Sequence, residues 1–203
     1  MCGGLDKIMP NTSVITPDKI IKELYDDYFN KYKEDIKKVL DLWTGNWYFS
    51  VFCASYTCKV IAIDTQKMSP KYPEYLKSHP HIMFYQEDIN DTNKSYMKDT
   101  YDLILLFNVV VFLDKKYFLE YLFPKYLERL NIWGTLCLTF FFEDDETMKS
   151  EQSLSFFDFK DLQPPTMHYA VQNTQDAYVE DFHKPYGKHF HHIWYIEIMR
   201  MEE

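Results

Sequence analysis

Hydrophobic positions in this chain form short runs that alternate with amphipathic segments. Five runs between residues 37 and 142 are mostly apolar on both faces and rich in β-branched or aromatic residues: "KKVLDL", "CKVIAID", "HIMFYQEDI", "YDLILLFNVVVFL" and "GTLCLTFFF". Runs of this kind are typical of strands buried between two helical layers. Helices are predicted between them, at 46–57, 70–78, 93–98 and 115–130. Strands and helices in alternation predict an α/β fold with a parallel sheet and right-handed crossovers.

The two ends of the chain have different patterns. Residues 1–14 mix Gly, Pro, Asn and Ser without periodicity, which predicts a loose leader. An outer helix is predicted within 15–35, because Thr16 can cap its first amides and Pro17 suits the first helical position. Near the C-terminus, "TMHYAVQN" and "KHFHHIWYIEIMRM" predict two strands joined by a long polar segment, an antiparallel hairpin at one sheet edge.

Length and composition restrict the class of protein. The 203 residues predict a single domain over 1–203, and a hydrophobic content of 46% predicts that it folds. A formal net charge of -9 disfavours nucleic acid as a partner. Four cysteines without a CxxC pair, and no signal-peptide pattern, predict a cytoplasmic protein. No apolar run reaches the roughly 18 residues of a membrane span, so no membrane association is expected.

Polar residues stand at the ends of four predicted strands, where a doubly wound sheet binds its ligands. The first strand ends in "VLDLWTGN", and the second, third and fourth end at Asp64, Asp88 and Asn108. A carboxylate at such a place can accept two hydrogen bonds from vicinal hydroxyls, and another can accept from an exocyclic amine. Alternatively, each aspartate caps the helix or turn that follows it.

Over Ile15 to Phe142, and through the closing hairpin to the end, the chain resembles the class I S-adenosylmethionine-dependent methyltransferases. The family's (D/E)xGxGxG pattern falls on Asp41, Trp43, Gly45 and Trp47. Its ribose-binding acid falls on Asp64, and its acid near adenine falls on Asp88 beside Ile89. Two further segments, "DLILLFNVVVFL" and "LERLNIWGTLCLTF", match the family's fourth strand and the turn into its fifth. Within the family, the chain looks most like the small-molecule group that includes tellurite-resistance and thiopurine-type enzymes.

The resemblance implies a three-layer Rossmann-like sandwich whose seven-stranded, mostly parallel sheet has an antiparallel last strand. It implies S-adenosylmethionine as cofactor, methyl transfer to a small-molecule acceptor, a monomer or homodimer, and an acceptor-side insert at 143–188. The cofactor-binding positions that it implies are Asp41, Trp43, Thr44, Gly45, Asn46, Trp47, Asp64, Thr65, Asp88, Ile89, Asn108 and Val109.

Tryptophan replaces glycine at three positions of the resembled pattern, Trp43, Trp47 and Trp133. Glycine is used in such a turn because the backbone needs a positive φ and must approach the ligand closely. An indole that points into the cleft would occupy the cofactor's volume. One hypothesis is a noncatalytic domain that acts as a binding or scaffold protein.

A second hypothesis concerns the genetic code, because UGA is translated as glycine in some bacterial lineages and as tryptophan in others. The three tryptophans would then be UGA codons that encode glycine. Overall glycine content is only 5 in 203 residues, against a usual ~7%. A nicotinamide-dependent oxidoreductase ranks last, since its GxGxxG spacing would put a small residue at Tyr48.

Histidines cluster near the C-terminus, in "DFHKPYGKHFHHIW". Because histidine exchanges protons near neutral pH, His183 and His189 are the candidate catalytic bases. His189 and His191 share one strand face and could bind zinc together with His183 or Asp181, but a polar strand end is favoured over a metal site.

Overall fold

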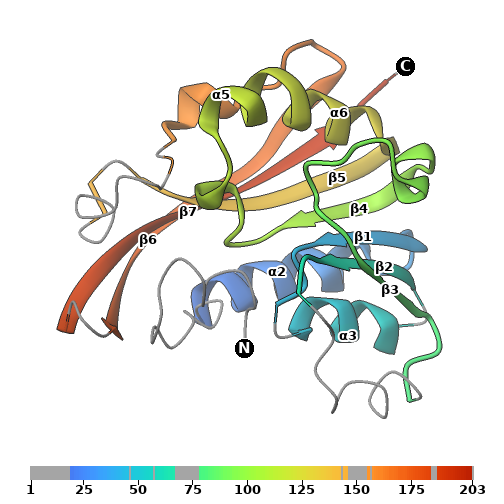
Figure 1. Cartoon of the computed structure of the whole chain (residues 1–203), viewed down its shortest axis with the longest axis horizontal. Coiled ribbons are helices and arrows are strands. Elements are labelled where there is room, and N and C mark those ends of the chain that lie inside the picture. Colours follow the sequence, from blue (N-terminus) through green and yellow to red (C-terminus); the bar gives the residue numbers. More distant parts are fainter. Residues whose placement is uncertain are drawn as a thin grey trace.

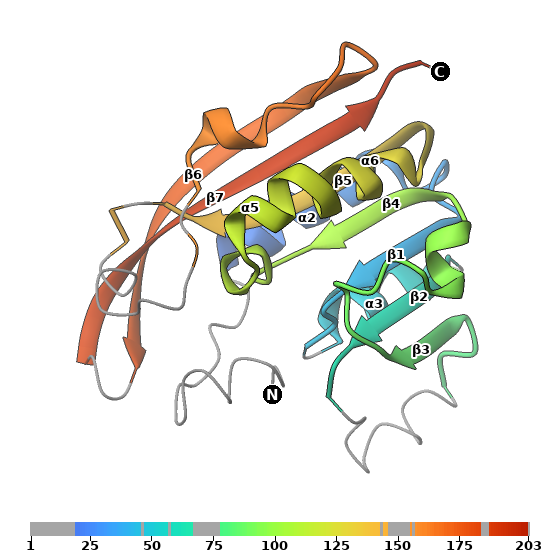
Figure 2. The same cartoon turned by 45° about the horizontal axis from the view of Figure 1, so that its top comes forward.

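The computed structural model of the chain describes residues 19–45, 47–56, 58–66, 78–142, 144–145, 155, 157–183 and 187–202, with the backbone alone at 19–25, 177, 179–183 and 187–189. Seven strands form one sheet in the order β3-β2-β1-β4-β5-β7-β6 (Figure 2). The strands are β1 Lys38–Leu42, β2 Lys59–Asp64, β3 Ile82–Gln86, β4 Tyr101–Leu106, β5 Leu130–Phe141, β6 Tyr169–His183 and β7 Gly187–Arg200. Neighbouring strands from β3 to β5 are parallel, whereas β7 is antiparallel to both β5 and β6. The predicted α/β fold with its antiparallel last strand is confirmed.

Helices cover both faces of the sheet (Figure 1). On one face, α2 Lys19–Tyr32 and α3 Tyr48–Ser55 pack over a cluster that includes Phe29, Phe49 and Cys53. On the other face lies a continuous helical run, made of α5 Lys115–Tyr117, a π-helical turn at Phe118–Leu122 and α6 Phe123–Glu128. This run buries Phe118 and Tyr126 completely. Central strands are therefore apolar on both faces, as the continuous hydrophobic runs predicted.

Several boundaries differ from the predicted ones. The predicted helix near 93–98 is a 3-10 turn, Ser95–Lys98, and the predicted strand 101–113 ends at Leu106 before a 3-10 turn at Val110–Phe112. The prediction of a long polar connection in the C-terminal hairpin is wrong, because β6 continues to His183 and only residues 184–186 separate it from β7. The predicted leader 1–14 and helix 70–78 lie outside the described residues, apart from residue 78.

The turn predicted before the fifth strand is instead a bulge inside β5. Leu130 pairs with Tyr101 and Thr135 with Leu103, so six residues of β5 face three of β4. Gly134 is required at this bulge, since a Cβ atom there would lie 2.8 Å from the carbonyl oxygen of Tyr101.

The predicted acceptor-side segment 143–188 contains a 3-10 turn at Phe159–Leu162 and all of β6. The hairpin of β6 and β7 also extends past the end of β5, whose Phe141 pairs with Ile193 (Figure 1).

Candidate functional site

The candidate site lies where the chain order of the strands reverses, between β1 and β4. From β1 the chain proceeds outward through β2 to β3, whereas β4 begins on the other side of β1 and leads to β5. Ligands of doubly wound sheets bind at such a point, outside the carboxyl ends of the strands. Asp41, the turn at 43–47, Asp64 and Asn108 all belong to strand ends at this edge.

Tryptophan residues adopt the left-handed backbone that favours glycine. Five described residues have a positive φ: Trp43 (79°), Gly45 (50°), Trp47 (66°), Asn108 (54°) and Trp133 (67°). Asparagine is tolerated in this region, but a bulky residue there is strained by roughly 1–2 kcal/mol. The three tryptophans are those at which the sequence pattern predicts glycine, so the backbone at these positions keeps the conformation of a glycine turn.

The indoles of the turn lie in different places. Trp43 stacks on Phe112, which follows β4, with ring centroids 6.2 Å apart, so this indole spans the loops after β1 and β4, where a doubly wound sheet has its ligand crevice. Trp47 is only 3% exposed and packs in the core against Phe84 of β3. The hypothesis of a noncatalytic domain, in which both indoles fill the cleft, therefore does not hold for Trp47, whose side chain lies in the core.

Asp64 connects the end of β2 to the turn. One carboxylate oxygen accepts from the amide of Gly45 at 3.2 Å and the other from the amide of Gln66 at 2.9 Å. The side chain is 5% exposed, and burial raises its pKa above the usual aspartate range while these amides oppose the change. A carboxylate has about four lone-pair sites, so Asp64 retains capacity for two hydroxyl donors.

Asp41 lies below the same turn, in the last part of β1. Its Oδ2 accepts from the Ser50 hydroxyl of α3 at 2.5 Å. The side chain is 4% exposed. Burial raises the pKa of Asp41 to about 7, the Ser50 hydroxyl opposes the rise, and the nearby charge of Asp64 adds to it.

Residues after β3 and β4 complete the predicted cofactor site. Asp88 Oδ1 accepts from the amide and side chain of Asn90 at 2.9 and 2.8 Å, which forms a tight turn after β3. Ile89 is buried, and its carbonyl accepts from the Tyr126 hydroxyl at 2.7 Å. Asn108 donates its amide to Thr139 Oγ1 at 2.8 Å, and that hydroxyl donates to Asn108 Oδ1 at 3.1 Å.

The remaining predicted cofactor positions have varied surroundings. Thr44 is 5% exposed, and its hydroxyl has no hydrogen-bond partner within the described part of the chain. Thr65 is exposed and Val109 fully buried, whereas Asn46 lies outside the described residues.

The predicted bases lie on the part of the hairpin that extends past β5. In the strand register, His183 pairs with Gly187 and His189 with Asp181. Gly187 is six residues before Ile193, the partner of Phe141, so an extended strand places the hairpin tip roughly 20 Å beyond β5. The side chains of both histidines lie outside the described part, and their role stays a prediction.

Sequence reasoning missed a histidine–carboxylate network next to this edge. His191 Nδ1 lies 3.0 Å from Asp145 Oδ2, and both side chains are almost fully buried. On the other face of β7, His192 lies between two carboxylates, 2.5 Å from Asp144 and 3.2 Å from Asp176. The available signal was the acidic run "EDDE" at 143–146, shortly after β5, together with two adjacent histidines in the hairpin.

Tyr178 adds a further contact to the His192 part of this network. Tyr178 stacks on His192 with ring centroids 4.1 Å apart and donates to Asp144 at 2.9 Å. Partial desolvation raises the pKa of Asp144, but the bonds to His192 and Tyr178 outweigh it and lower the pKa overall. The network thus fastens the segment after β5 to the hairpin.

Within the described residues, no group of three or more His, Cys, Asp or Glu side chains could hold a metal ion. No helix in the described ranges is both long and apolar enough to cross a membrane.

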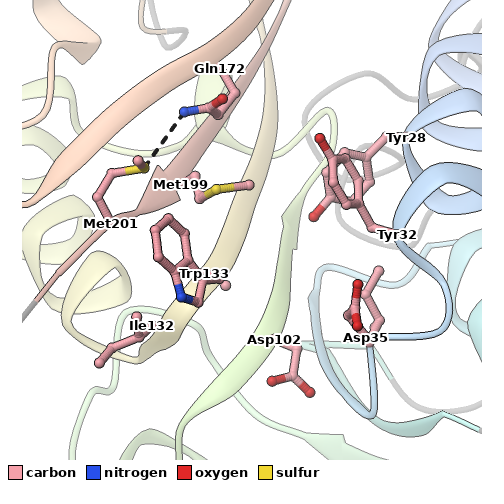
Figure 3. A pocket seen from close by; sticks show the side chains of 11 residues that line it. Tyr28, Tyr32, Asp35, Asp102, Ile132, Trp133, Gln172, Met199 and Met201 are labelled. Carbon is pink, nitrogen blue, oxygen red and sulfur yellow. Dashed lines mark hydrogen bonds between the residues drawn. The ribbon is translucent and has the colours of Figure 1, made fainter.

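A cavity of about 630 Å³ lies at the opposite edge of the sheet, near the amino ends of β4 and β5. Tyr28 and Tyr32 of α2 face Trp133 of the β5 bulge across it (Figure 3). It is separate from the strand-end site.

Comparison with solved structures identifies the fold. The N-methyltransferase NodS from Bradyrhizobium japonicum WM9, in complex with S-adenosyl-l-homocysteine, has a TM-score of 0.68 at 14% identity, covering 98% of this chain and 97% of that one. Magnesium protoporphyrin IX methyltransferase (ChlM) from Synechocystis PCC 6803, with bound SAH, has a TM-score of 0.66 at 13% identity, covering 97% and 92%. The fold is therefore that of these methyltransferases.

TehB from Haemophilus influenzae has a TM-score of 0.64 at 18% identity, covering 87% of this chain and 62% of that one. No curated protein matches the sequence. The family model of the tellurite resistance protein TehB matches residues 22–156, more than half of the chain. The chain therefore belongs to the TehB family.

Proposed function

We propose that this protein transfers a methyl group from S-adenosylmethionine to a small-molecule acceptor. Membership of the TehB family and a fold shared with methyltransferases crystallised with SAH support this function. The observation that carries it is the Asp64 carboxylate, which is fixed at the switch point by the Gly45 amide and has lone pairs available for hydroxyl groups.

The polar groups at the ends of β2 and β3 fit the adenosine half of the cofactor. Asp64 would hold the ribose hydroxyls, with Thr65 beside it. Asp88 would accept from the adenine amine, because its Oδ2 accepts no hydrogen bond from the described residues while Oδ1 receives both donors of Asn90. Ile89 would donate its amide to the ring. When bound, S-adenosylmethionine supplies an electrophilic sulfonium methyl group.

The turn and the loop after β4 would hold the other half of the cofactor. The buried Thr44 hydroxyl without a described partner would orient it, together with Gly45 and Asn46. Asn108, whose backbone is fixed by Thr139, and Val109 would align the methyl group with the acceptor. Alignment alone accounts for a large part of the acceleration of such displacement reactions.

Trp43 is the one residue whose described side chain opposes binding, because its indole bridges the crevice. The noncatalytic alternative is not supported, since Trp47 lies in the core and the Gly45 amide donates to the Asp64 carboxylate.

A titration of S-adenosylmethionine by calorimetry tests the function. We compare the chain with its Trp43→Gly variant and use Trp47→Gly as the matched control, since both changes restore glycine in the turn but only the first clears the crevice. We expect Trp43→Gly to bind more tightly than the other two. The proposal fails if neither the chain, nor Trp43→Gly, nor the triple variant with Trp47→Gly and Trp133→Gly binds while all remain folded.

The acceptor would lose its proton at the edge that carries the histidines. His183 and His189 remain candidate bases. Because the TehB family is described by tellurite resistance, tellurite is the first acceptor to test, with formation of S-adenosylhomocysteine as the readout.

A further inference from the structure

Asp41 is a buried carboxylate at the first position of the (D/E)xGxGxG pattern, and the proposed function assigns it no further role. It accepts from the hydroxyl of Ser50, the third residue of α3. Trp47 at the N-cap of α3 makes no side-chain cap hydrogen bond, so Ser50 is where this helix end is bonded to β1. The pair joins β1 to α3 across the cofactor turn.

No cation compensates this carboxylate among the described residues. From β2, Asp64 faces it and contributes like charge. From α3, Ser50 donates to it, and Cys53 is a buried thiol in the same cluster. The strand partners of Asp41 are Ala62 of β2 and Leu105 of β4, which are apolar. Burial and the charge of Asp64 therefore both favour the protonated acid, and the pKa near 7 agrees with this geometry.

The two forms of the proposed cofactor differ in charge. S-adenosylmethionine has a sulfonium, an ammonium and a carboxylate and is a net cation, whereas S-adenosylhomocysteine lacks the sulfonium charge and is neutral overall. A cation placed at the crevice above Asp41 favours the ionised carboxylate, and a neutral ligand does not.

We propose that the Asp41–Ser50 pair carries a proton in the ligand-free protein and releases it when the sulfonium cofactor binds, so that the site distinguishes cofactor from product by charge. The inference rests on the proposed methyltransferase function. Asp41 is a positioning and proton-storing residue in this scheme and transfers nothing to the acceptor. The proton returns after methyl transfer, when the sulfonium charge has been lost.

Calorimetry in two buffers of different ionisation enthalpy, such as phosphate and Tris, measures the released protons. We expect S-adenosylmethionine to release about half a proton at pH 7, since a group whose pKa is near 7 is about half protonated there. S-adenosylhomocysteine should release fewer. The ratio of the two affinities should shift toward S-adenosylmethionine by about tenfold between pH 6 and 8. Titration of Asp64 cancels in this ratio, because both ligands carry the same ribose.

Variants distinguish a proton-storing role of the Asp41–Ser50 pair from a purely structural role at the start of α3. Asp41→Asn should abolish the difference in proton release between the two ligands. Ser50→Ala should move the pH range of proton release upward, because the hydroxyl stabilises the ionised form of Asp41. Ser50→Thr keeps a hydroxyl and should return the pH range to that of wild type. Ser55→Ala is the matched control, since the Ser55 hydroxyl bonds only the Phe52 carbonyl at the other end of α3. A cap alone would change stability without changing the proton count.

The ligand-free protein provides an independent test. Because burial raises the folded-state pKa of Asp41, ionisation of the unfolded chain should lower wild-type stability as pH rises from about 4 to 7, and Asp41→Asn should lack this component. Equal proton counts for both ligands, or counts unchanged by Asp41→Asn, overturn the proposal. If neither ligand binds the chain, the Trp43→Gly protein or the triple glycine variant while all remain folded, the methyltransferase function fails and the coupling fails with it. An unchanged pH dependence in Asp41→Asn would show separately that Asp41 stores no proton.

Discussion

At the scale of single residues, the three tryptophans at glycine positions are the unusual feature of this protein. Each has a positive φ, whereas no positive φ is found for the fourth, Trp194, which lies in β7. Glycine adopts the left-handed backbone without strain, but an L-residue with a large side chain does not. Sequence pattern and backbone conformation therefore indicate glycine at the same three positions.

Trp133→Gly should raise the free energy of unfolding by roughly 1 kcal/mol. The indole is 61% exposed, so its removal loses little burial, while glycine relieves the strain at φ 67°. Urea unfolding measures the change, and Trp133→Ala is the matched control because it removes the indole but keeps the strain. An alanine variant as stable as the glycine variant would contradict this explanation.

The codons provide a second test at this scale. We expect UGA at positions 43, 47 and 133 and UGG at position 194, because only the first three have a glycine backbone. The nucleotide sequence of the gene decides the question. UGG at the first three positions would mean that the protein carries these strained tryptophans as natural residues.

At the scale of elements, β7 determines the chemistry next to the site because its two faces carry different groups. Side chains alternate along a strand, so His191, Tyr195 and Glu197 face the α2 and α3 layer while His192 and Trp194 face the other. Asp145 contacts His191 on the first face, and Asp144 contacts His192 on the second. A two-residue segment after β5 is thus held from both faces of the hairpin.

His191→Ala should destabilise the protein by roughly 1–3 kcal/mol, since Asp145, which is completely buried, loses the imidazole donor. His168→Ala, at an exposed position, is the control and should have little effect. Urea denaturation followed by circular dichroism compares the two. Equal effects would mean that the Asp145 contact contributes nothing to stability.

Glu197 should give the hairpin a pH-dependent stability. Burial raises its pKa, and hydrogen bonds from Tyr195 at 2.9 Å and Asn173 at 3.2 Å oppose the rise. Because the unfolded chain ionises at lower pH than the folded one, this group lowers stability as pH rises above about 4. Glu197→Gln should therefore gain stability relative to wild type between pH 4 and 7, as thermal unfolding across that range would show. A difference that does not change with pH would refute the assignment.

At the scale of the whole molecule, one continuous sheet separates two apolar cores. The proposed cofactor site takes residues from β1 and β2 and from the loops after β1, β3 and β4. A ligand at this site contacts several elements at once, so its binding should stabilise the entire domain.

S-adenosylhomocysteine at 100 times its Kd should stabilise the Trp43→Gly protein by about 2.7 kcal/mol. For a chain of this length that corresponds to an increase in Tm of roughly 5–10 °C. Differential scanning calorimetry measures it, with adenosine at the same concentration as a weaker reference ligand. A Tm that does not change would argue against a cofactor site at this edge.

The sequence by itself determined the order of the elements and the strand-end residues, because buried parallel strands need continuous apolar runs and their ends need polar side chains. From these, the placement of Asp64, Asp88 and Asn108 at or after strand ends could be predicted, and the resemblance to the methyltransferase pattern indicated a glycine conformation at positions 43, 47 and 133. Backbone conformation and hydrophobic period are local properties, and a single chain segment is sufficient to encode them.

Only the tertiary structure decided which way the side chains of the turn are directed and which distant groups meet. Trp43 reaches Phe112 while Trp47 enters the core, although the sequence presents the two in the same pattern. The pairs Asp41–Ser50, Asp145–His191 and Asp144–His192 depend on the pairing register of β1, β5 and β7 and on how α3 packs against the sheet. Register and packing are settled by the entire core at once, and no pattern within one segment contains that information.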